Sequence, residues 1–262
     1  MRRHPLQDAD GLSDIGLDEL DAVAALRRRF DAKYLLSRHA LPELLERLGP
    51  THRVLEIERL RSFEYRTTYF DTPELEAFRH HLQGRRRRLK VRVRHYVDSG
   101  RCSFELKLQG PRGSTVKHRL PCDPELRQGL RAESLTALAR WVGGAYGRPP
   151  PAPLGPTLEI LYTRTTLVAP EARERVTVDV DLRMRRPGGD LYGRLDGELA
   201  VVESKSARGL ARAARQLHAL GARRLETMSK YCLGVLLAHG AARGNALLPV
   251  LRHCRTHPAR RP

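Results

Sequence analysis

The sequence predicts an α+β fold built mainly from antiparallel strands, with helices between them. Segments rich in Val, Thr, Tyr and Phe alternate between apolar and polar residues, which is the period of a strand with two different faces. The turn sequences "DSG" and "GPRGS" directly follow two of these segments, as hairpin connections do. With 262 residues, 40% of them hydrophobic, the chain is long enough to bury a sizeable core.

Strands and helices alternate in the first half of the chain. A polar segment, residues 1–24, precedes them and is expected to be a flexible leader. Helical patterns cover residues 37–49 and 72–84, and Gly49 and Gly84 are placed to end them. The expected strands are residues 27–36, 65–72, 88–97, 102–109 and 115–120.

The second half repeats the theme of strands with helices between them. A helix is expected within residues 124–143, and the Pro-rich segment 147–156 is a linker or a surface loop. The main domain is expected to span residues 25–240, followed by a basic tail, residues 241–262. The remaining expected elements are strands at 157–168, 174–184 and 197–206, and helices at 206–220 and 229–240.

One face of nearly every predicted strand is ionisable and carries both signs. In residues 88–96 the alternate positions hold Arg88, Lys90, Arg92 and Arg94. The same period groups Glu105 with Lys107, Lys117 with Arg119, Asp179 with Thr177, and Glu203 with Lys205. An ordinary solvated sheet face is one explanation. A solvated face, however, also tolerates Ser, Thr and Gln, whereas the alternate positions here are mostly ionisable. A charged surface that binds a specific partner is therefore the second explanation.

The net charge of +18 favours a polyanionic partner. If the charged faces converged inside a closed barrel, unpaired charge there would be costly, so the lumen would need a polyanion and a metal ion. Phosphate chains match arginine forks and lysine point charges, and carboxylates match Mg²⁺ or Mn²⁺. "GPRGSTVK" is not a P-loop, because it joins two strands and lacks the required spacing.

The chain has few lysines and few cysteines. Arginine provides 42 of the 48 basic residues, so the six positions that keep lysine are candidates for a requirement for a compact ammonium group. The four cysteines form no C-x-x-C pair, which is typical of free thiols in a reducing compartment. No apolar stretch is long enough for a membrane span or a secretory signal, so a cytoplasmic protein is expected.

Eight short segments occur in an order that resembles a known family, the VTC domain. They are "KYLLS", "YRTTYFDT", "KVRVRHY", "FELKLQG", "TVKHRL", "VTVDVDL", "VVESK" and "SKYCLG". This is the polyphosphate polymerase domain of the vacuolar transporter chaperone complex, with bacterial relatives, in the triphosphate tunnel metalloenzyme superfamily. The resemblance covers residues 27 to about 237. It implies an antiparallel eight-stranded β-barrel whose charged lumen is a tunnel, flanked by helices.

The resemblance also implies a role for individual residues. Lys230, Arg92 and Arg94 correspond to residues next to the reacting phosphate. Glu203 corresponds to the metal-binding glutamate, and Glu105 and Asp179 are further candidate metal ligands. The expected substrate-binding residues are Lys33, Lys90, Arg92, Arg94, Lys107, Lys117, Arg119, Arg164, Arg175, Lys205 and Lys230, of which Lys90 and Arg119 are included because they share a strand face with the others.

The first strand departs from the superfamily pattern. Where E-x-E-x-K is frequent, this chain has Arg29, Asp31 and Lys33. One carboxylate is shortened and the other is replaced by arginine, which weakens a two-metal triphosphatase interpretation. The phosphate-sensing domain and the membrane helices of the eukaryotic polymerase have no counterpart here, so coupled transport and regulation are not implied.

The sequence thus predicts a phosphotransferase that depends on Mn²⁺ or Mg²⁺. It would move the γ-phosphoryl group of ATP onto inorganic polyphosphate. One alternative is a tunnel-type triphosphatase, in which water is the acceptor. The other is a non-catalytic module that binds polyphosphate or RNA, to which the "RRRR" run at residues 85–88 would contribute. Of polyphosphate and RNA, RNA is the less favoured partner, because the chain lacks an RNA-binding signature.

Overall fold

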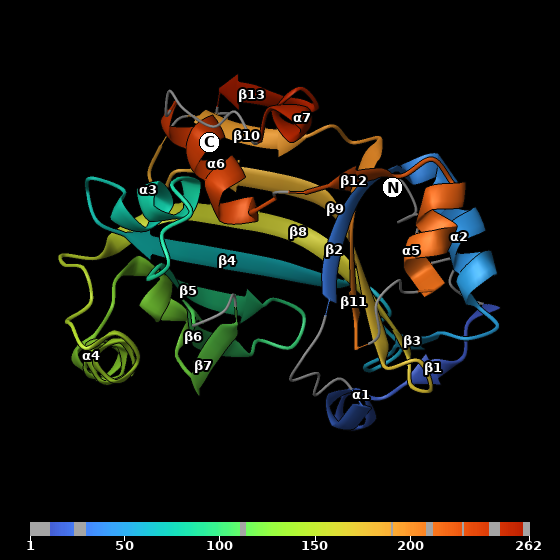
Figure 1. Ribbon diagram of the computed structural model, residues 1–262, viewed down its shortest axis with the longest axis horizontal. Coiled ribbons are helices and arrows are strands. Elements are labelled where there is room, and N and C mark those ends of the chain that lie inside the picture. Colours follow the sequence, from blue (N-terminus) through green and yellow to red (C-terminus); the bar gives the residue numbers. More distant parts are fainter. Residues whose placement is uncertain are drawn as a thin grey trace. The chain divides into compact units, whose positions relative to one another are not determined.

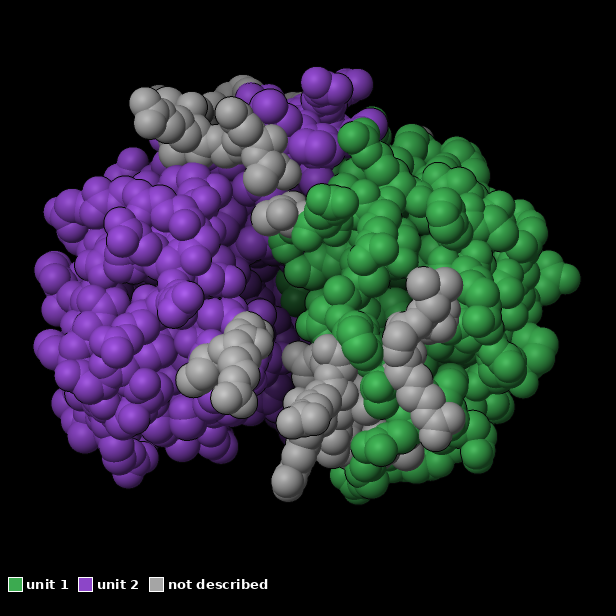
Figure 2. All heavy atoms as spheres, viewed as in Figure 1, with its two compact units in different colours: residues 1–64, 162–182, 195–228 green, residues 65–161, 183–194, 229–262 purple. Residues whose placement is uncertain are grey.

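A computed structural model of the chain has an α+β fold with a large antiparallel sheet and several helices (Figure 1). The protein divides into two compact units, coloured in Figure 2 and described separately below. Unit 1 contains residues 1–64, 162–182 and 195–228, and unit 2 contains residues 65–161, 183–194 and 229–262. The structure describes residues 11–23, 30–110, 114–189, 191–207, 212–226, 228–240 and 247–258.

Unit 1 is a sheet with strand order β12-β2-β11-β9-β8. In its centre, Glu203 lies opposite Lys33 on one neighbouring strand and Thr177 on the other. Its elements are β1 (Asp14–Ile15), α1 (Leu17–Val23), β2 (Phe30–Ser37), η2 (Arg38–Ala40), α2 (Leu41–Leu48), β3 (Arg53–Leu55), β11 (Leu199–Ser206), α5 (Arg212–Ala219) and β12 (Arg223–Leu225). Two longer strands contribute residues to both units, β8 (Gly155–Ala169) and β9 (Glu174–Arg185).

One face of the unit 1 sheet packs against two helices. Helix α2 places Leu41, Leu44, Leu45 and Leu48 on one side, at the helical spacing of three and four residues. These leucines join a buried cluster with residues of α5 and with alternate residues of β9 and β11. The strand residues in that cluster are Val176, Val178, Val180, Ala200 and Val202. The intervening residues of the same strands therefore lie on the opposite face.

Unit 2 is a second antiparallel arrangement, with strand order β8-β4-β5-β6-β7. Residue Glu105 lies opposite Arg92 on one side and Arg119 on the other. Its elements are β4 (Phe63–Asp71), α3 (Glu76–Leu82), β5 (Leu89–Tyr96), β6 (Cys102–Gln109), β7 (Thr115–Pro121), η4 (Pro124–Gln128), α4 (Ala132–Tyr146), β10 (Leu191–Leu195), α6 (Lys230–His239), α7 (Leu248–Leu251) and β13 (Cys254–Pro258).

The core of unit 2 lies on the apolar face of β5 and β6. Alternate residues of these strands are almost completely buried against α4, which Figure 1 shows beside β5, β6 and β7. The helix contributes Leu138, Val142 and Tyr146. The strand residues are Leu89, Val91, Val93, Phe104, Leu106 and Leu108. The apolar half of the alternation read from residues 88–96 is therefore confirmed as core.

The predicted α+β class is confirmed, and so are most long strands. Within the parts of the chain that the structure describes, neither strand order returns to its starting strand, so the closed eight-stranded barrel stays a prediction. Strands β3, β10 and β12 were not predicted. They have three to five residues each, which is too short for a clear alternation to appear.

Residues 11–23 and 247–258, the described parts of the two terminal segments, contain buried residues. In the predicted leader, Leu12, Ile15 and Leu20 are buried, and β1 pairs with β3. In the predicted basic tail, Leu247 and Val250 are buried, and β13 pairs with β10. Aliphatic residues spaced within polar segments explain this packing, because each segment has enough of them to dock on a neighbouring strand or helix.

The Pro-rich segment 147–156 lies within unit 2, in agreement with a surface loop. Part of the predicted helix at 206–220, residues 208–211, lies outside the described residues. No helix among the described residues is long and apolar enough to cross a membrane.

Candidate functional site

Unit 2 carries a group of charged residues on its second sheet face, here called the β5 cluster. Its strand members are Lys90, Arg92, Arg94, Glu105, Lys107, Lys117 and Arg119, and α6 adds Lys230. Because cross-strand partners share a face, the register places the strand residues in rows across β5, β6 and β7. The sheet thus brings together every residue that the sequence placed on these three strands.

Glu105 is the centre of one row. Arg92 donates to its Oε2 through Nε at 2.8 Å, and Arg119 Nη2 lies 3.3 Å from Oε1. Arg94 lies 3.9 Å away. Burial would raise the pKa of the Glu105 carboxyl, but the three guanidinium groups outweigh it and hold that pKa well below its usual range. Three cations around one carboxylate leave an excess of positive charge at a largely buried position.

The next row consists of three lysines in register, Lys90, Lys107 and Lys117. Like charges directly opposite each other destabilise a sheet. Their field also acts on His81 of α3, whose pKa is lowered to about 3 by burial first and then by Lys90. Such a row favours any ligand that brings several negative charges at strand spacing.

Two tyrosines connect Arg92 to the start of α6. Arg92 Nη1 donates to the Tyr69 hydroxyl at 3.1 Å, and the Tyr69 ring stacks on Tyr231 with 4.9 Å between centroids. The Tyr231 hydroxyl donates a short hydrogen bond to buried Asp71. This places α6 so that Lys230, its first residue, acts electrostatically on Tyr69.

Asp71 is itself fixed by the backbone of α3. Its carboxylate accepts from the amides of Ala77 at 2.9 Å and Phe78 at 3.0 Å. On the α6 side, the Ser229 hydroxyl accepts from Lys90 Nζ at 2.9 Å and caps the helix by accepting from the Cys232 amide. Two cluster cations are thus positioned by the same helix terminus. The motifs "YFDT" and "SKY" were noticed in the sequence, but roles for Asp71, Tyr69 and Tyr231 were missed.

Unit 1 carries its own charged face, here called the β11 cluster. Its members are Asp31, Lys33, Arg164, Arg175, Asp179, Glu203 and Lys205. Lys205 lies between Asp31 on β2 and Arg175 on β9, and Lys33 also donates to the Met228 carbonyl at 2.7 Å. All the residues predicted on these strands therefore share the face that is opposite the α2 and α5 core.

Asp179 is completely buried and is held by one arginine. Arg164 donates to its two oxygens at 2.6 and 2.8 Å, and the same guanidinium lies 5.2 Å from the ring of Tyr162. This two-point geometry is that of a strong ion pair. Its effect is to fix the direction of the Arg164 side chain.

Lys205 forms an ion pair on the same face, 2.9 Å from Glu203. Burial lowers the pKa of Lys205 to about 8, although Glu203 opposes that shift by favouring the charged ammonium. A metal ion bound to the Glu203 carboxylate would therefore act directly on the charge of Lys205.

The candidate metal ligands differ in their surroundings. Glu105 and Asp179 are each engaged by arginine, and their role as metal ligands stays a prediction. Across the described part of the chain, no three residues of the His, Cys, Asp and Glu types gather in a metal-binding group. Glu203 forms an ion pair with Lys205, and its carboxylate offers the oxygen ligands that Mg²⁺ or Mn²⁺ prefers.

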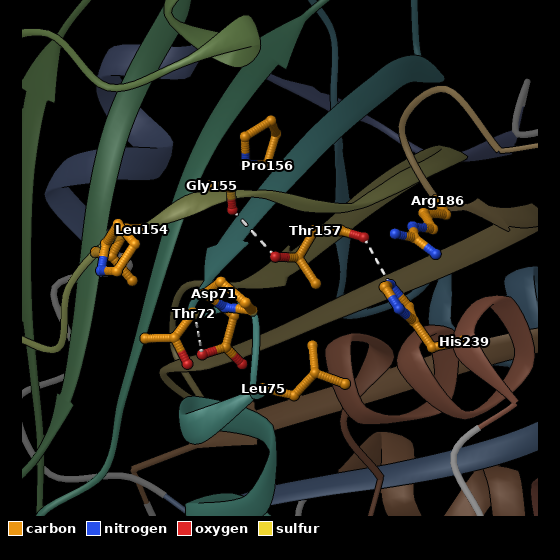
Figure 3. Close-up of a pocket in the computed structure, with 11 residues that line it drawn as sticks. Asp71, Thr72, Leu75, Leu154, Gly155, Pro156, Thr157, Arg186 and His239 are labelled. Carbon is orange, nitrogen blue, oxygen red and sulfur yellow. Dashed lines mark hydrogen bonds between the residues drawn. The ribbon is translucent and has the colours of Figure 1, made fainter.

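Unit 2 also has a pocket of about 330 Å³ that lies apart from the predicted residues (Figure 3). Its lining includes Asp71, Thr157, Arg186 and His239, and His239 Nε2 is 2.9 Å from the Thr157 carbonyl oxygen. No sequence motif pointed to it, because it combines residues from four separate segments. None of the cations of the β5 cluster lines it.

The fold and the two clusters define an α+β protein with cation-rich sheet faces. The chain belongs to the VTC domain family, whose model matches residues 28–239. This confirms the resemblance to the VTC domain read from the sequence. A search of curated proteins found no match.

Solved structures with a similar fold have low sequence identity to this chain. A "putative adenylate cyclase" from Bacillus halodurans has 14% identity and a TM-score of 0.50, over 76% of this chain and 93% of that chain. A "putative adenylyl cyclase" from Hippeastrum, described as having a dominant triphosphatase activity, has 16% identity and a TM-score of 0.46, over 82% and 98%. A "putative adenylate cyclase" from Vibrio parahaemolyticus has 15% identity and a TM-score of 0.44, over 78% and 97%.

Proposed function

We propose that this protein is a metal-dependent phosphotransferase that moves the γ-phosphoryl group of ATP onto an inorganic polyphosphate chain. The observation that carries the proposal is the lysine row, Lys90, Lys107 and Lys117, beside the arginines on Glu105. A linear phosphate chain supplies repeated negative charge along a strand, which relieves the repulsion within the row.

The reaction needs little covalent chemistry from the protein. A terminal oxygen of the polyphosphate attacks the γ-phosphorus of ATP, the bond between the β,γ-bridging oxygen and that phosphorus breaks, and ADP leaves with the bridging oxygen. Arg92 and Arg94 neutralise charge on the transferred group, and Lys230 stabilises the leaving or attacking oxygens. In unit 1, Lys33, Arg164, Arg175 and Lys205 of the β11 cluster form a second set of cations suited to phosphate oxygens.

Members of the triphosphate tunnel superfamily use divalent metals, and the donor set here fits one ion. We assign Mg²⁺ or Mn²⁺ to Glu203, and the metal when bound would neutralise phosphate oxygens as a Lewis acid. Glu105 and Asp179 instead hold the arginines that bind phosphate. ATP as donor fits a cytoplasmic protein, and all four cysteines, Cys102, Cys122, Cys232 and Cys254, are free thiols, as a reducing compartment favours.

One incubation tests the proposal against its alternatives. The protein is mixed with ATP and Mn²⁺, and the products are resolved on a gel stained for polyphosphate and assayed for free phosphate. A polyphosphate ladder supports the transferase. Orthophosphate without polymer would mean that water is the acceptor and the protein is a triphosphatase. Tight tripolyphosphate binding with neither product would leave a non-catalytic binding module.

A further inference from the structure

We propose that the hydroxyl groups of Tyr69 and Thr67, alternate residues of β4, donate hydrogen bonds to the bound phosphate chain. This inference rests on the proposed function and adds two neutral ligands to a site otherwise made of cations. Neither residue was assigned a role from its sequence pattern. The argument begins with the two hydroxyl groups themselves.

The Tyr69 hydroxyl oxygen accepts one hydrogen bond, but its hydrogen is not donated to any described residue. Its side chain is buried, and its oxygen accepts from Arg92 at 3.1 Å. Within the described residues, no carbonyl, carboxylate or hydroxyl oxygen lies in position to accept the phenolic hydrogen. Since the Arg92 N–H occupies a lone pair of that oxygen, the O–H bond points elsewhere.

Thr67 shows the same feature more strongly. It is 1% exposed, and its Oγ1 has no hydrogen-bond partner among the residues that the structure describes. Buried hydroxyl groups are rarely left unpaired, because removal from water without a new partner costs free energy. An acceptor that arrives with a ligand accounts for both hydroxyl groups.

The register identifies the face on which that ligand binds. Tyr69 lies opposite Arg92 and Thr67 lies opposite Arg94, on the face of the β5 cluster. The intervening residue Thr68 lies opposite Val93, on the face of the core. The missing acceptor is therefore expected beside two arginines, where an acceptor-only anion such as a deprotonated phosphate is favoured.

The electrostatics of Tyr69 support this assignment. Burial raises the pKa of its phenol, but Arg92, Arg94 and Lys230 outweigh burial, and the pKa is lowered overall. A more acidic phenol donates a stronger hydrogen bond to a phosphate oxygen. Stacking on Tyr231 keeps the ring from turning away, so the donor is already directed when the chain arrives.

The test compares two variants that remove one hydroxyl group each, Tyr69→Phe and Thr67→Val. Affinity for tripolyphosphate is measured by calorimetry, and the melting temperature is measured without ligand. Each variant should bind tripolyphosphate about 10-fold more weakly or worse, the loss expected for a hydrogen bond to a charged group. Thr67→Val should melt at the wild-type temperature or above it, because an unpaired buried group has been removed. Tyr69→Phe also loses the hydrogen bond from Arg92, so it should melt somewhat lower.

Two matched controls separate binding from structure. Tyr146→Phe removes a phenol that is already paired, since it donates toward the carbonyl oxygens of Arg88 and Gln109. It should melt lower and keep the affinity of the wild type. Thr68→Val alters the residue between the two hydroxyl groups on the other face of β4, and it should also keep that affinity.

The outcomes distinguish this inference from the proposed function. If Tyr69→Phe and Thr67→Val bind tripolyphosphate like the wild type, the hydroxyl groups serve the structure only and the inference is wrong. The proposed function survives that result provided that Arg92→Ala still weakens binding. If the wild-type protein does not bind tripolyphosphate at all, the proposed function fails first and the inference fails with it.

Discussion

At the scale of single residues, arginine side chains engage Glu105 and Asp179, two of the carboxylates on the charged strand faces. Glu105 and Asp179 were grouped with Glu203 from the sequence, because all three alternate with cations on charged strand faces. The alternation correctly predicted their faces. It could not predict that Arg92 would pair with Glu105 and Arg164 with Asp179, since ion pairing depends on cross-strand register and side-chain direction.

Arg92→Ala and Arg94→Ala should each weaken triphosphate binding by about 1.5–3 kcal/mol, the usual loss of a charged hydrogen bond. Arg92 should show the larger structural effect, because its removal leaves Glu105 with fewer donors. Calorimetry with tripolyphosphate checks affinity, and circular dichroism checks folding. Normal binding by both folded variants would contradict a phosphate role for the β5 cluster.

Glu203→Gln should abolish metal-dependent turnover with ATP while the fold stays intact. Glutamine keeps the size of the side chain but removes the charge that a hard divalent cation prefers. Turnover in Mn²⁺ should be measured beside a thermal melt. Because Lys205 also loses its partner, some decrease in melting temperature is expected. Wild-type turnover per folded molecule, with only a lowered melting point, would show that Glu203 is an ion-pair residue.

At the scale of elements, the predicted strands agree with the structure better than the predicted first residues of the helices do. Thr72 and Gly84 do bound the α3 region, yet the helix itself begins at Glu76 after a left-handed Leu75. Thr72 accepts from the Glu76 amide at 3.2 Å, so the cap acts one turn earlier than the regular helix. Local sequence shows that a cap is present, but tertiary contacts around Asp71 determine where the helix begins.

Helix α5 depends on a buried pair, His52 and Glu174. Glu174 accepts from the amides of Arg212 and Ala213 at the start of α5, and His52 Nε2 lies 3.8 Å from its carboxylate. Burial lowers the pKa of His52 from 6.5 to about 4. The native state therefore binds fewer protons than the unfolded state between these values, so stability is fully present above pH 6.5 and falls as the pH falls toward 4.

His52→Gln should remove that pH dependence. For the wild type we expect a loss of about 2 kcal/mol on going from pH 7 to pH 5 through this group alone. Glu174, whose pKa is raised by burial, acts in the opposite direction and is shared by both proteins. Denaturant unfolding at the two pH values measures the difference. Equal losses in wild type and variant would show that His52 is not the titrating group.

At the scale of the whole molecule, the order of eight motifs predicted the family, and the strand alternation predicted both charged faces. The division into two compact units was not predicted. Strands β8 and β9 contribute residues to each unit, and strand length beyond the charged motif leaves no separate signal in the sequence.

Tripolyphosphate should raise the melting temperature more than duplex DNA of equal phosphate content. Both anions meet a net charge of +18, but two arginine side chains of the β5 cluster are largely shielded, with Arg94 12% and Arg92 20% exposed. A thin linear phosphate chain can reach these arginines, whereas a DNA duplex is too wide to do so. Tripolyphosphate therefore binds the native state more tightly and stabilises it more. Thermal melts at fixed ionic strength provide the comparison. A larger shift with DNA would favour a nucleic-acid partner.

The row of Lys90, Lys107 and Lys117 has a consequence for the protein in a cell. Repulsion across three strands makes the empty form easier to open than the occupied form. Proteases act on opened molecules, so the turnover of the protein should slow when phosphate chains are plentiful and accelerate when they are scarce. On the proposed function, its abundance would then follow the supply of phosphate chains without any separate sensor, because three like charges share one row of a sheet.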